Sequence, residues 1–233
     1  MKILAVDSSA KTASVALLDD GILISECFVN AGLTHSRTLM PMVSNILTQA
    51  DLKIEDVDAF AVNAGPGSFT GIRIGVAAIK GLSLASEKPC AGISTLEACA
   101  YNFADEDCVV CVSMDARCNQ VYTAIFRCEN GIMSRICDDK AVSVDDLGKE
   151  LSIFNEKIIL AGDGAEICFK AFSDNLPNCI LAGEIRRYQR AYGCAVAALN
   201  NKELFKDSAE LVPVYLRLPQ AERELKIRKG ELK

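Results

Sequence analysis

The sequence contains a single histidine, His35, among its 233 residues. Zinc and iron sites that use two or more histidines, such as the H-E-x-x-H helix of metalloproteases, therefore cannot be built from this chain alone. The chain also lacks an excess of positive charge, because 25 lysines and arginines stand against 31 acidic residues. Proteins that bind nucleic acid unaided usually present a basic face. The composition thus argues against a two-histidine metal enzyme and against an independent nucleic-acid binder.

Long apolar runs are missing as well. The opening residues MKILAVDSS have too short an apolar stretch for a signal peptide. We also expect no window of the ~18 apolar residues that a membrane span needs. We therefore predict a cytoplasmic protein without a membrane partner.

The eleven cysteines are odd in number and scattered from Cys27 to Cys194. In a cytoplasmic chain this pattern indicates reduced, mostly buried thiols rather than disulfides. Cys108 and Cys111 form a C-x-x-C motif, but they lie in a β-branched run, where residues three apart point to opposite faces of a strand. They are therefore not predicted to share a metal ion.

The sequence predicts the same order of strands and helices twice along the chain. The first copy begins with an apolar strand that ends in Asp7 and continues into a hairpin that turns at Asp20-Gly21. The second copy begins with a strand that ends in Asp115 and turns at Asn130-Gly131. The matching order of strand, hairpin, strand and helices indicates duplication. The predicted lobes are residues 1–105 and 106–233, the second including a C-terminal tail.

Three antiparallel strands followed by helix-linked parallel strands are the plan of the actin, sugar-kinase and Hsp70 ATPase superfamily. We therefore predict an α/β fold of two ribonuclease-H-like lobes, each with a mixed five-stranded sheet and helices. In that superfamily the first acid and first hairpin of each lobe face the cleft, although each acid could equally cap its strand. Gly162 and Gly164 could either form a tight turn or contact a ligand, and the sequence leaves both interpretations open. The candidate residues for a vestigial nucleotide site or cleft are Asp7, Ser8, Ser9, Thr12, Asp115, Arg117, Gly162 and Gly164.

The segment NAGPGSFTGIRIG, residues 63–75, looks like a phosphate-binding loop. A Walker loop requires G-x-x-x-x-G-K-[ST], whereas here Gly67 and Gly71 are four apart and isoleucine follows where lysine is expected. The dinucleotide motif G-x-G-x-x-G also fails, because its last glycine comes one position late. The segment instead opens a helix with a face of small residues, which favours close packing, either inside the lobe or across a subunit boundary.

Several strings together resemble the bacterial TsaB (YeaZ) family. They are, in order, ILAVDSS, THSRTLMPM, NAGPGSFTGIRIG, GISTLEA, DARCNQVY and VPVYLRLPQAE, and they run from residue 3 to about residue 222. The resemblance implies a non-catalytic subunit in the synthesis of threonylcarbamoyladenosine (t6A) at adenosine 37 of tRNAs that read codons beginning with A. It implies no catalytic residues and no metal. It implies no cofactor either, except for possible ATP or ADP that binds weakly or at the junction with TsaE.

The resemblance also implies the partners. TsaB proteins pair their N-terminal lobe with the N-terminal lobe of the metal-dependent enzyme TsaD through a helical bundle, and the same surface can form a homodimer when TsaD is absent. TsaE, a P-loop ATPase, completes the set, and tRNA would be reached only through the complex. The predicted partner-interface residues are Leu39, Met42, Ile46, Gly71, Gly75 and Ala78.

Two other functions stay open. An independent ATPase or phosphotransferase is one, because DSSAKTASVALL resembles the first phosphate hairpin of the superfamily. A glycoprotease-like peptidase is the other, although the chain has no G-x-S-x-G elbow. We expect His35 to make a polar contact at a helix start, VPVYLRLP to lie against the second lobe, and the tail at 222–233 to be solvated.

Overall fold

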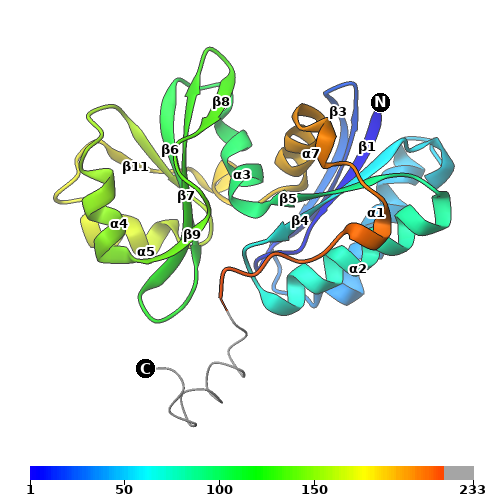
Figure 1. The fold of residues 1–233 in the computed structure, drawn as a ribbon, viewed down its shortest axis with the longest axis horizontal. Coiled ribbons are helices and arrows are strands. Elements are labelled where there is room, and N and C mark those ends of the chain that lie inside the picture. Colours follow the sequence, from blue (N-terminus) through cyan, green and yellow to red (C-terminus); the bar gives the residue numbers. More distant parts are fainter. Residues whose placement is uncertain (218–233) are drawn as a thin grey trace, which may run out of the picture.

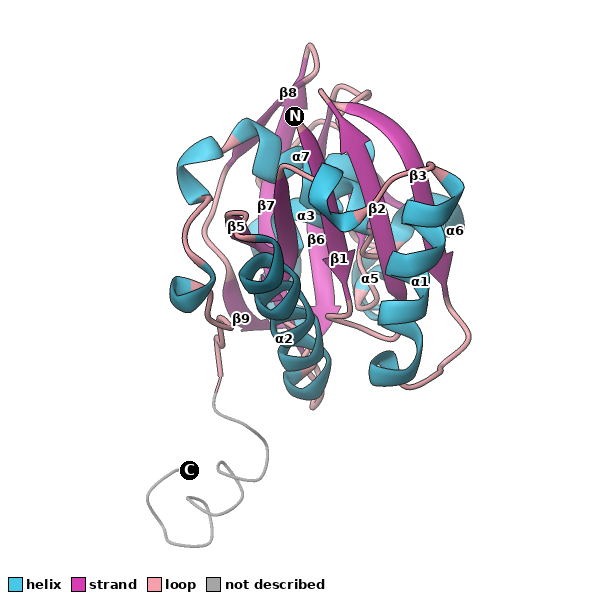
Figure 2. Cartoon of the chain, turned by 90° about the vertical axis from the view of Figure 1, so that its right-hand side faces the viewer, coloured by secondary structure: helices cyan, strands magenta, loops and turns pink. Residues whose placement is uncertain are grey.

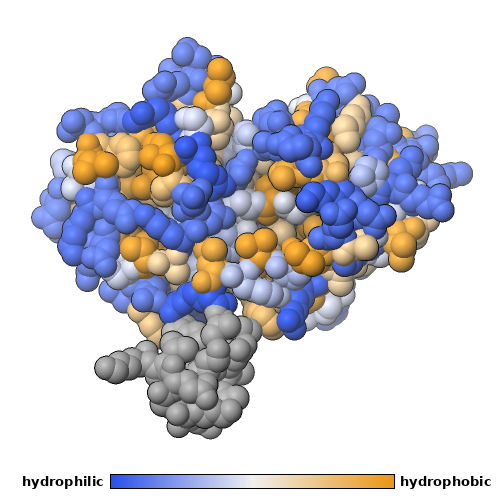
Figure 3. Space-filling model, in the orientation of Figure 1, coloured by the Kyte–Doolittle hydropathy of each residue, from blue (hydrophilic) through white to orange (hydrophobic). Residues whose placement is uncertain are grey.

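The structure is a computed structural model in which residues 1–217 are described, and it consists of two lobes, each built on an open β-sheet (Figure 1). A notch separates the two lobes in the space-filling view (Figure 3). In the first sheet β1 pairs antiparallel with β2 and parallel with β4, in the order β3-β2-β1-β4-β5. Its elements are β1 (Lys2–Asp7), β2 (Ala13–Asp19), β3 (Ile22–Val29), α1 (His35–Gln49), β4 (Ala59–Gly65), α2 (Phe69–Ser86), β5 (Cys90–Ser94) and α3 (Thr95–Ala100).

The second sheet has the order β11-β10-β6-β7-β8, which repeats the topology of the first. Its elements are β6 (Cys108–Asp115), β7 (Gln120–Glu129), β8 (Ile132–Arg135), β9 (Lys140–Ser143), α4 (Val144–Leu151), β10 (Ile158–Ala161), α5 (Ala165–Phe172), β11 (Cys179–Leu181), α6 (Glu184–Arg187) and α7 (Ala191–Asn200). Short 3-10 turns occupy Ile54–Asp56, Tyr101–Phe103, Lys202–Leu204 and Ser208–Glu210. The predicted fold class and the duplication are confirmed.

The second sheet carries one strand more than predicted. The long strand β7 pairs with β8 through residues 126–129 and with β9 through residues 120–123. Two short strands therefore share one edge of a single long strand. No turn signal in the sequence marked the second pairing.

Alternation along the central strand β1 gives the first sheet two buried faces. Leu4 and Val6 point toward α1 and α2, whereas Ile3 and Ala5 point toward α7. Figure 2 shows α1 and α2 in front of this sheet and α7 behind it. A sheet covered on both faces explains why its central strands read as continuous apolar runs.

The chain after the second lobe returns to the first lobe. Helix α7 packs on β1, β2 and α3, and its alanines fill the narrow space between them. Lys206 then exchanges backbone hydrogen bonds of 2.9 Å with Cys90 of β5, and Val214 N donates to Ala64 O at 2.7 Å. The prediction that residues 106–233 lie with the second lobe is therefore wrong for residues 191–214. Of the segment VPVYLRLP, Val214 and Tyr215 contact the first lobe, Arg217 reaches Ala116 of the second lobe, and residues 218 and 219 fall outside the described chain. The predicted solvated tail at 222–233 falls outside the described residues.

Helix α2 is the longest helix of the first lobe. By length and composition it could cross a membrane, with 18 residues and a mean hydropathy of 1.2. The expectation that no such window exists is therefore wrong on this criterion. One such helix is weak evidence, since a core helix of a soluble protein passes the same test. Here α2 packs on β4, and Ser68 Oγ caps its first turn by accepting from Gly71 N at 3.2 Å.

The cysteines are free thiols in the structure, and most are buried. Cys108 and Cys111 belong to the cores on opposite faces of β6, as the strand period predicted. Burial raises the pKa of the Cys111 thiol to about 12 and that of the Cys168 thiol to about 11. Such thiols are poor nucleophiles, so most of the cysteines act as small apolar core residues.

Candidate functional site

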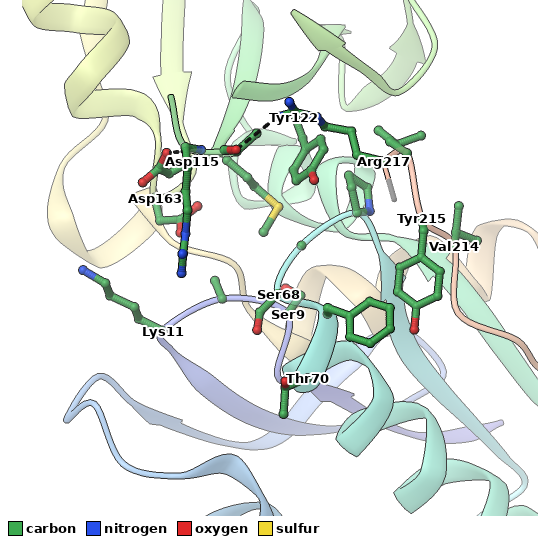
Figure 4. Close-up of a pocket in the computed structure, with 18 of the residues that line it drawn as sticks. Ser9, Lys11, Ser68, Thr70, Asp115, Tyr122, Asp163, Val214, Tyr215 and Arg217 are labelled. Atoms are coloured by element: carbon green, nitrogen blue, oxygen red, sulfur yellow. Dashed lines mark hydrogen bonds between the residues drawn. The ribbon is translucent and has the colours of Figure 1, made fainter. Parts of the chain in front are cut away.

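A cavity of about 670 Å³ lies between the lobes, where β1 and β6 end (Figure 4). Four segments of the chain and two single residues line it: the first hairpin at residues 9–11, the glycine segment at 66–70, residues 114–118 at the end of β6, residues 214–217, Tyr122 and Asp163. Asp115 and Arg117 reach this cavity, as the superfamily plan predicted, and so does Ser9. Residues from both ends of the sequence therefore form one site.

Asp7 lies beneath the cavity rather than in it. Its side chain is fully buried, and Oδ1 accepts hydrogen bonds from Ser9 Oγ at 2.6 Å and Asn63 Nδ2 at 2.9 Å. Within residues 1–217, Oδ2 has no hydrogen-bond partner. Burial raises the pKa of this carboxyl. Asp7 is therefore placed to support the hairpin and does not face the cavity.

The hydroxyl groups of the first hairpin also point inward. Ser8 Oγ donates to Gly71 O at 2.9 Å, and Thr12 Oγ1 donates to Gln189 O at 3.5 Å. Ser9 O accepts from Ser68 N at 2.7 Å. The groups that would surround a phosphate in this hairpin thus already bond to the protein.

The glycines after β10 form a tight turn against β6. Gly162 N donates to Arg187 O at 2.6 Å, and Gly164 N donates to Ser113 O at 2.9 Å. A Cβ at Gly162 would lie 2.2 Å from Ser113 O, and its φ of +92° is one that other residues rarely adopt. Close backbone approach therefore accounts for both glycines, in line with the tight turn weighed from the sequence.

Between these glycines lies an acid that the sequence did not single out. Asp163 lines the cavity and accepts from Gln189 Nε2 at 3.2 Å. Burial raises its pKa. Asp115, at the end of β6, is exposed and accepts from Arg117 N at 2.7 Å. The signal for Asp163 was present, because it follows a strand just as Asp115 ends one.

An aromatic pair at the mouth of the cavity was also missed. The rings of Phe69 and Tyr215 stack with centroids 4.7 Å apart. The Arg73 guanidinium lies 3.9 Å from the centroid of Phe69, and Arg73 Nε donates to Tyr215 OH at 2.9 Å. The sequence places Tyr215 against the second lobe, so it does not predict the contact of Tyr215 with the start of α2.

The predicted partner-interface residues are mostly inside the first lobe. The side chains of Leu39, Met42 and Ile46 are buried under α1. A Cβ at Gly71 would lie 2.1 Å from Ser8 O, and one at Gly75 would lie 2.6 Å from Ser8 Oγ. The prediction is therefore wrong for these five residues: the small face of α2 approaches its own sheet. Ala78, the sixth, is partly buried against the same core.

The opposite face of α2 is open. Ala77, Gly81 and Leu84 are exposed there, Leu84 with 73% of its surface, and a Cβ at Gly81 would meet nothing within 4 Å. Helix α1 lies beside α2 and exposes Met40 (Figure 2). We call Ala77, Gly81 and Leu84 the outer face. The helical periodicity of the sequence places Gly81 and Ala85 on the same face as Gly71 and Gly75. The structure corrects this, because Gly71 and Gly75 are buried against the sheet whereas Gly81 and Ala85 are exposed.

The single histidine makes the predicted polar contact at a helix start. His35 is the first residue of α1, and its Nε2 lies 2.7 Å from Ala10 O. Among residues 1–217, no group of three or more His, Cys, Asp or Glu side chains is placed to hold a metal ion.

Comparison with known protein families finds a model that matches most of the chain. The family described as "TsaD: tRNA N6-adenosine threonylcarbamoyltransferase" matches residues 30–225. The tRNA threonylcarbamoyladenosine biosynthesis protein TsaB of Bacillus subtilis is 31% identical over 222 residues, which cover 95% of this chain and 96% of that protein. TsaB of Escherichia coli is 40% identical over 135 residues, covering 57% of this chain and 58% of that protein.

Solved structures agree on the fold. A Pseudomonas aeruginosa protein described as similar to peptidase YEAZ is 25% identical, with a TM-score of 0.78, and the match covers 93% of this chain and 99% of that one. Component A of the (R)-2-hydroxyglutaryl-CoA dehydratase of Acidaminococcus fermentans has a TM-score of 0.50 at 12% identity, covering 87% and 99%. The second likeness concerns the two-lobed architecture alone.

Proposed function

Because this chain belongs to the TsaB (YeaZ) family of tRNA threonylcarbamoyladenosine biosynthesis proteins, we propose that it is a non-catalytic partner subunit of the t6A transferase. Its role in tRNA threonylcarbamoylation is that of its family. In the proposal it works in the cytoplasm with TsaD and TsaE, on adenosine 37 of tRNAs that read codons beginning with A. It binds TsaD through its first lobe, forms a homodimer when alone, and needs no tightly bound cofactor.

The observation that carries the proposal is the outer face. Helix α2 packs on its own sheet, on α1 and on the 3-10 turns at Ile54–Asp56 and Ser208–Glu210, but these contacts leave the outer face exposed. Exposed apolar patches on soluble proteins commonly mark contact surfaces. At Gly81 the open space lets a partner helix approach the backbone of α2 closely.

The inward bonds of the first hairpin support the non-catalytic part of the proposal. Ser8, Ser9 and Thr12 are buried and bonded to the protein. An independent ATPase would need such groups to turn toward a phosphate at a cost of several hydrogen bonds. The rival therefore predicts a rearranged hairpin and loss of activity in Asp7→Asn.

The test is a reconstituted reaction containing cognate TsaD, TsaE, threonylcarbamoyl donor and tRNA, in which t6A is measured with and without this chain. We expect t6A formation to depend on the chain. Leu84→Glu should abolish both the stimulation and a stable complex with TsaD on size-exclusion chromatography, because a charge would be buried against the partner. Ile153→Glu, at an equally exposed position of the second lobe, is the matched control and should change neither.

Two results would overturn the proposal. Equal amounts of t6A with and without the chain would remove the scaffold role. Turnover of ATP by the isolated chain that disappears in Asp7→Asn would favour the independent ATPase instead.

A further inference from the structure

The cavity between the lobes has two ends of different chemistry. Tyr215 and Phe69 stand at one end, with Tyr122 on the second-lobe side, and Lys11 and Asp163 stand at the other end (Figure 4). Tyr215 keeps 37% of its surface exposed, so its stack with Phe69 leaves ring surface open. Aromatic rings with open surface at the mouth of a polar cavity are suited to stacking on a flat ligand.

Three of the positive side chains near the cavity, Lys11, Arg73 and Arg217, form no ion pair with an acid among residues 1–217. Elsewhere in the described chain, the arginines of the second lobe and of its connections to the first form ion pairs: Arg127, Arg135, Arg186, Arg187 and Arg190. Arg217 instead spans the cleft and donates to Ala116 O at 3.2 Å. These uncompensated cations favour an anionic group at the cavity.

A flat ring joined to an anion is the chemistry of a phosphorylated nucleobase. The cavity volume of about 670 Å³ lies in the range of small-ligand sites and is ample for one nucleotide. The exposed carboxylate of Asp115 can accept hydrogen bonds from ribose hydroxyls. In the first hairpin the hydroxyls of Ser8 and Thr12 already bond to the protein, so the hairpin would contact the anion through Lys11, which lines the cavity.

We propose that this cavity binds one nucleotide of a single-stranded RNA segment, with the base against Tyr215 and Phe69 and a phosphate near Lys11. The exposed rim at Ser68 and Thr70 leaves room for the RNA chain on either side of that nucleotide. The choice of RNA rests on the proposed role in tRNA modification, and it departs from the expectation, drawn from the net charge of −6, that tRNA is reached only through the complex. A free adenine nucleotide shares the same chemistry, and the experiment separates the two sources.

The probe is a fluorescein-labelled RNA hairpin with a single-stranded loop, titrated with the full-length chain at low salt and read by fluorescence anisotropy. AMP and ATP are titrated as competitors. We expect saturable RNA binding that weakens as salt is added, as for a contact with few phosphates. Loss of one stacked base weakens binding about tenfold or more, so Tyr215→Ala should raise the dissociation constant by that factor.

Matched variants connect the binding to this cavity. Tyr215→Phe keeps the ring and should bind as the wild type does, whereas Lys11→Ala should weaken binding severalfold. Lys170→Ala, an exposed lysine on α5, should have no effect. With 4-thiouridine in the loop, cross-links should map to peptides containing Phe69 or Tyr215. Melting temperatures check that each variant is folded.

Each other outcome contradicts the proposal. Binding of ATP or AMP without binding of RNA assigns the cavity to a free nucleotide, and RNA binding that survives Tyr215→Ala and Lys11→Ala places the RNA elsewhere. The proposed function is tested separately: if the chain fails to stimulate t6A formation yet binds RNA through Tyr215, that function is wrong and this site remains. If it stimulates t6A formation and Tyr215→Ala leaves RNA binding unchanged, only this site is wrong.

Discussion

The two carboxylate oxygens of Asp7 have different surroundings. Oδ1 accepts hydrogen bonds from Ser9 and Asn63, whereas Oδ2 has no partner among the described residues. Desolvation raises the pKa of this carboxyl even though the donors on Oδ1 act in the opposite direction. The folded protein therefore favours the neutral acid more than the unfolded chain does.

This preference predicts how stability depends on pH. An acid whose pKa is raised on folding contributes stability below its unfolded pKa of about 3.9, and that contribution is lost as the pH rises through the folded pKa. Asp7→Asn keeps an acceptor for Ser9 and Asn63 but cannot ionise. We expect the variant to melt at a higher temperature than the wild type at neutral pH, with the difference shrinking as the pH falls toward about 4.

Differential scanning fluorimetry across that pH range measures the effect. Asp115→Asn, which removes an exposed carboxylate from the matching strand end of the second lobe, controls for the loss of one acid. A lower melting temperature for Asp7→Asn at neutral pH would show that the ionised carboxylate stabilises the fold.

At the scale of elements, α2 shows what periodicity can and cannot supply. The sequence identified Gly71 and Gly75 as one small face that some backbone must approach closely. The approaching group is Ser8, more than sixty residues earlier in the chain, and no local pattern connects the two. Periodicity defines the faces of a helix, but the neighbour of each face depends on the whole topology.

The two faces of α2 predict opposite effects of the same substitution. Gly75→Ala would place its Cβ 2.6 Å from Ser8 Oγ and 3.1 Å from Val62 Cγ2, so overpacking of about 1–3 kcal/mol outweighs the gain in helix propensity. Gly81→Ala meets no atom within 4 Å and should stabilise the chain by up to about 1 kcal/mol. Urea unfolding of both variants measures the difference, and equal stabilisation by the two would falsify this account of the small face.

The same limit explains which parts of the fold and site could be predicted. Strand order, the hairpins and the acids at Asp7 and Asp115 followed from local apolar runs and turn residues. The packing of α7 and the contact of Tyr215 with Phe69 could not be predicted in this way. Both arise because the chain leaves the second lobe after α6 and packs on the first lobe. A prediction that divides the chain into two equal copies therefore assigns residues 191–214 to the wrong lobe.

At the scale of the whole molecule, the lobes are joined by shared packing and by ion pairs. Helix α3 contacts strands of both sheets: Ala98 belongs to the core of the first lobe, whereas Leu96, Cys99 and Ala100 belong to the core of the second lobe. Arg186 donates to Asn102 O at 2.8 Å and pairs with Glu106 at 2.6 Å. Arg190 donates to Glu26 of β3 at 2.6 Å, beside the start of α7. The lobes should therefore unfold together rather than one by one.

Arg190→Ala tests this coupling. The change leaves Glu26, whose side chain is only 8% exposed, as an unpaired buried carboxylate, and breaking such a pair costs roughly 3 kcal/mol. Urea unfolding followed by far-UV circular dichroism and by tyrosine fluorescence should give one coincident transition, shifted to lower urea in the variant. Arg127→Ala removes an exposed ion pair with Glu156 and should lower the urea midpoint of unfolding far less. Two separated transitions in the wild type would mean that α3 and Glu26 do not bind the lobes into one cooperative unit.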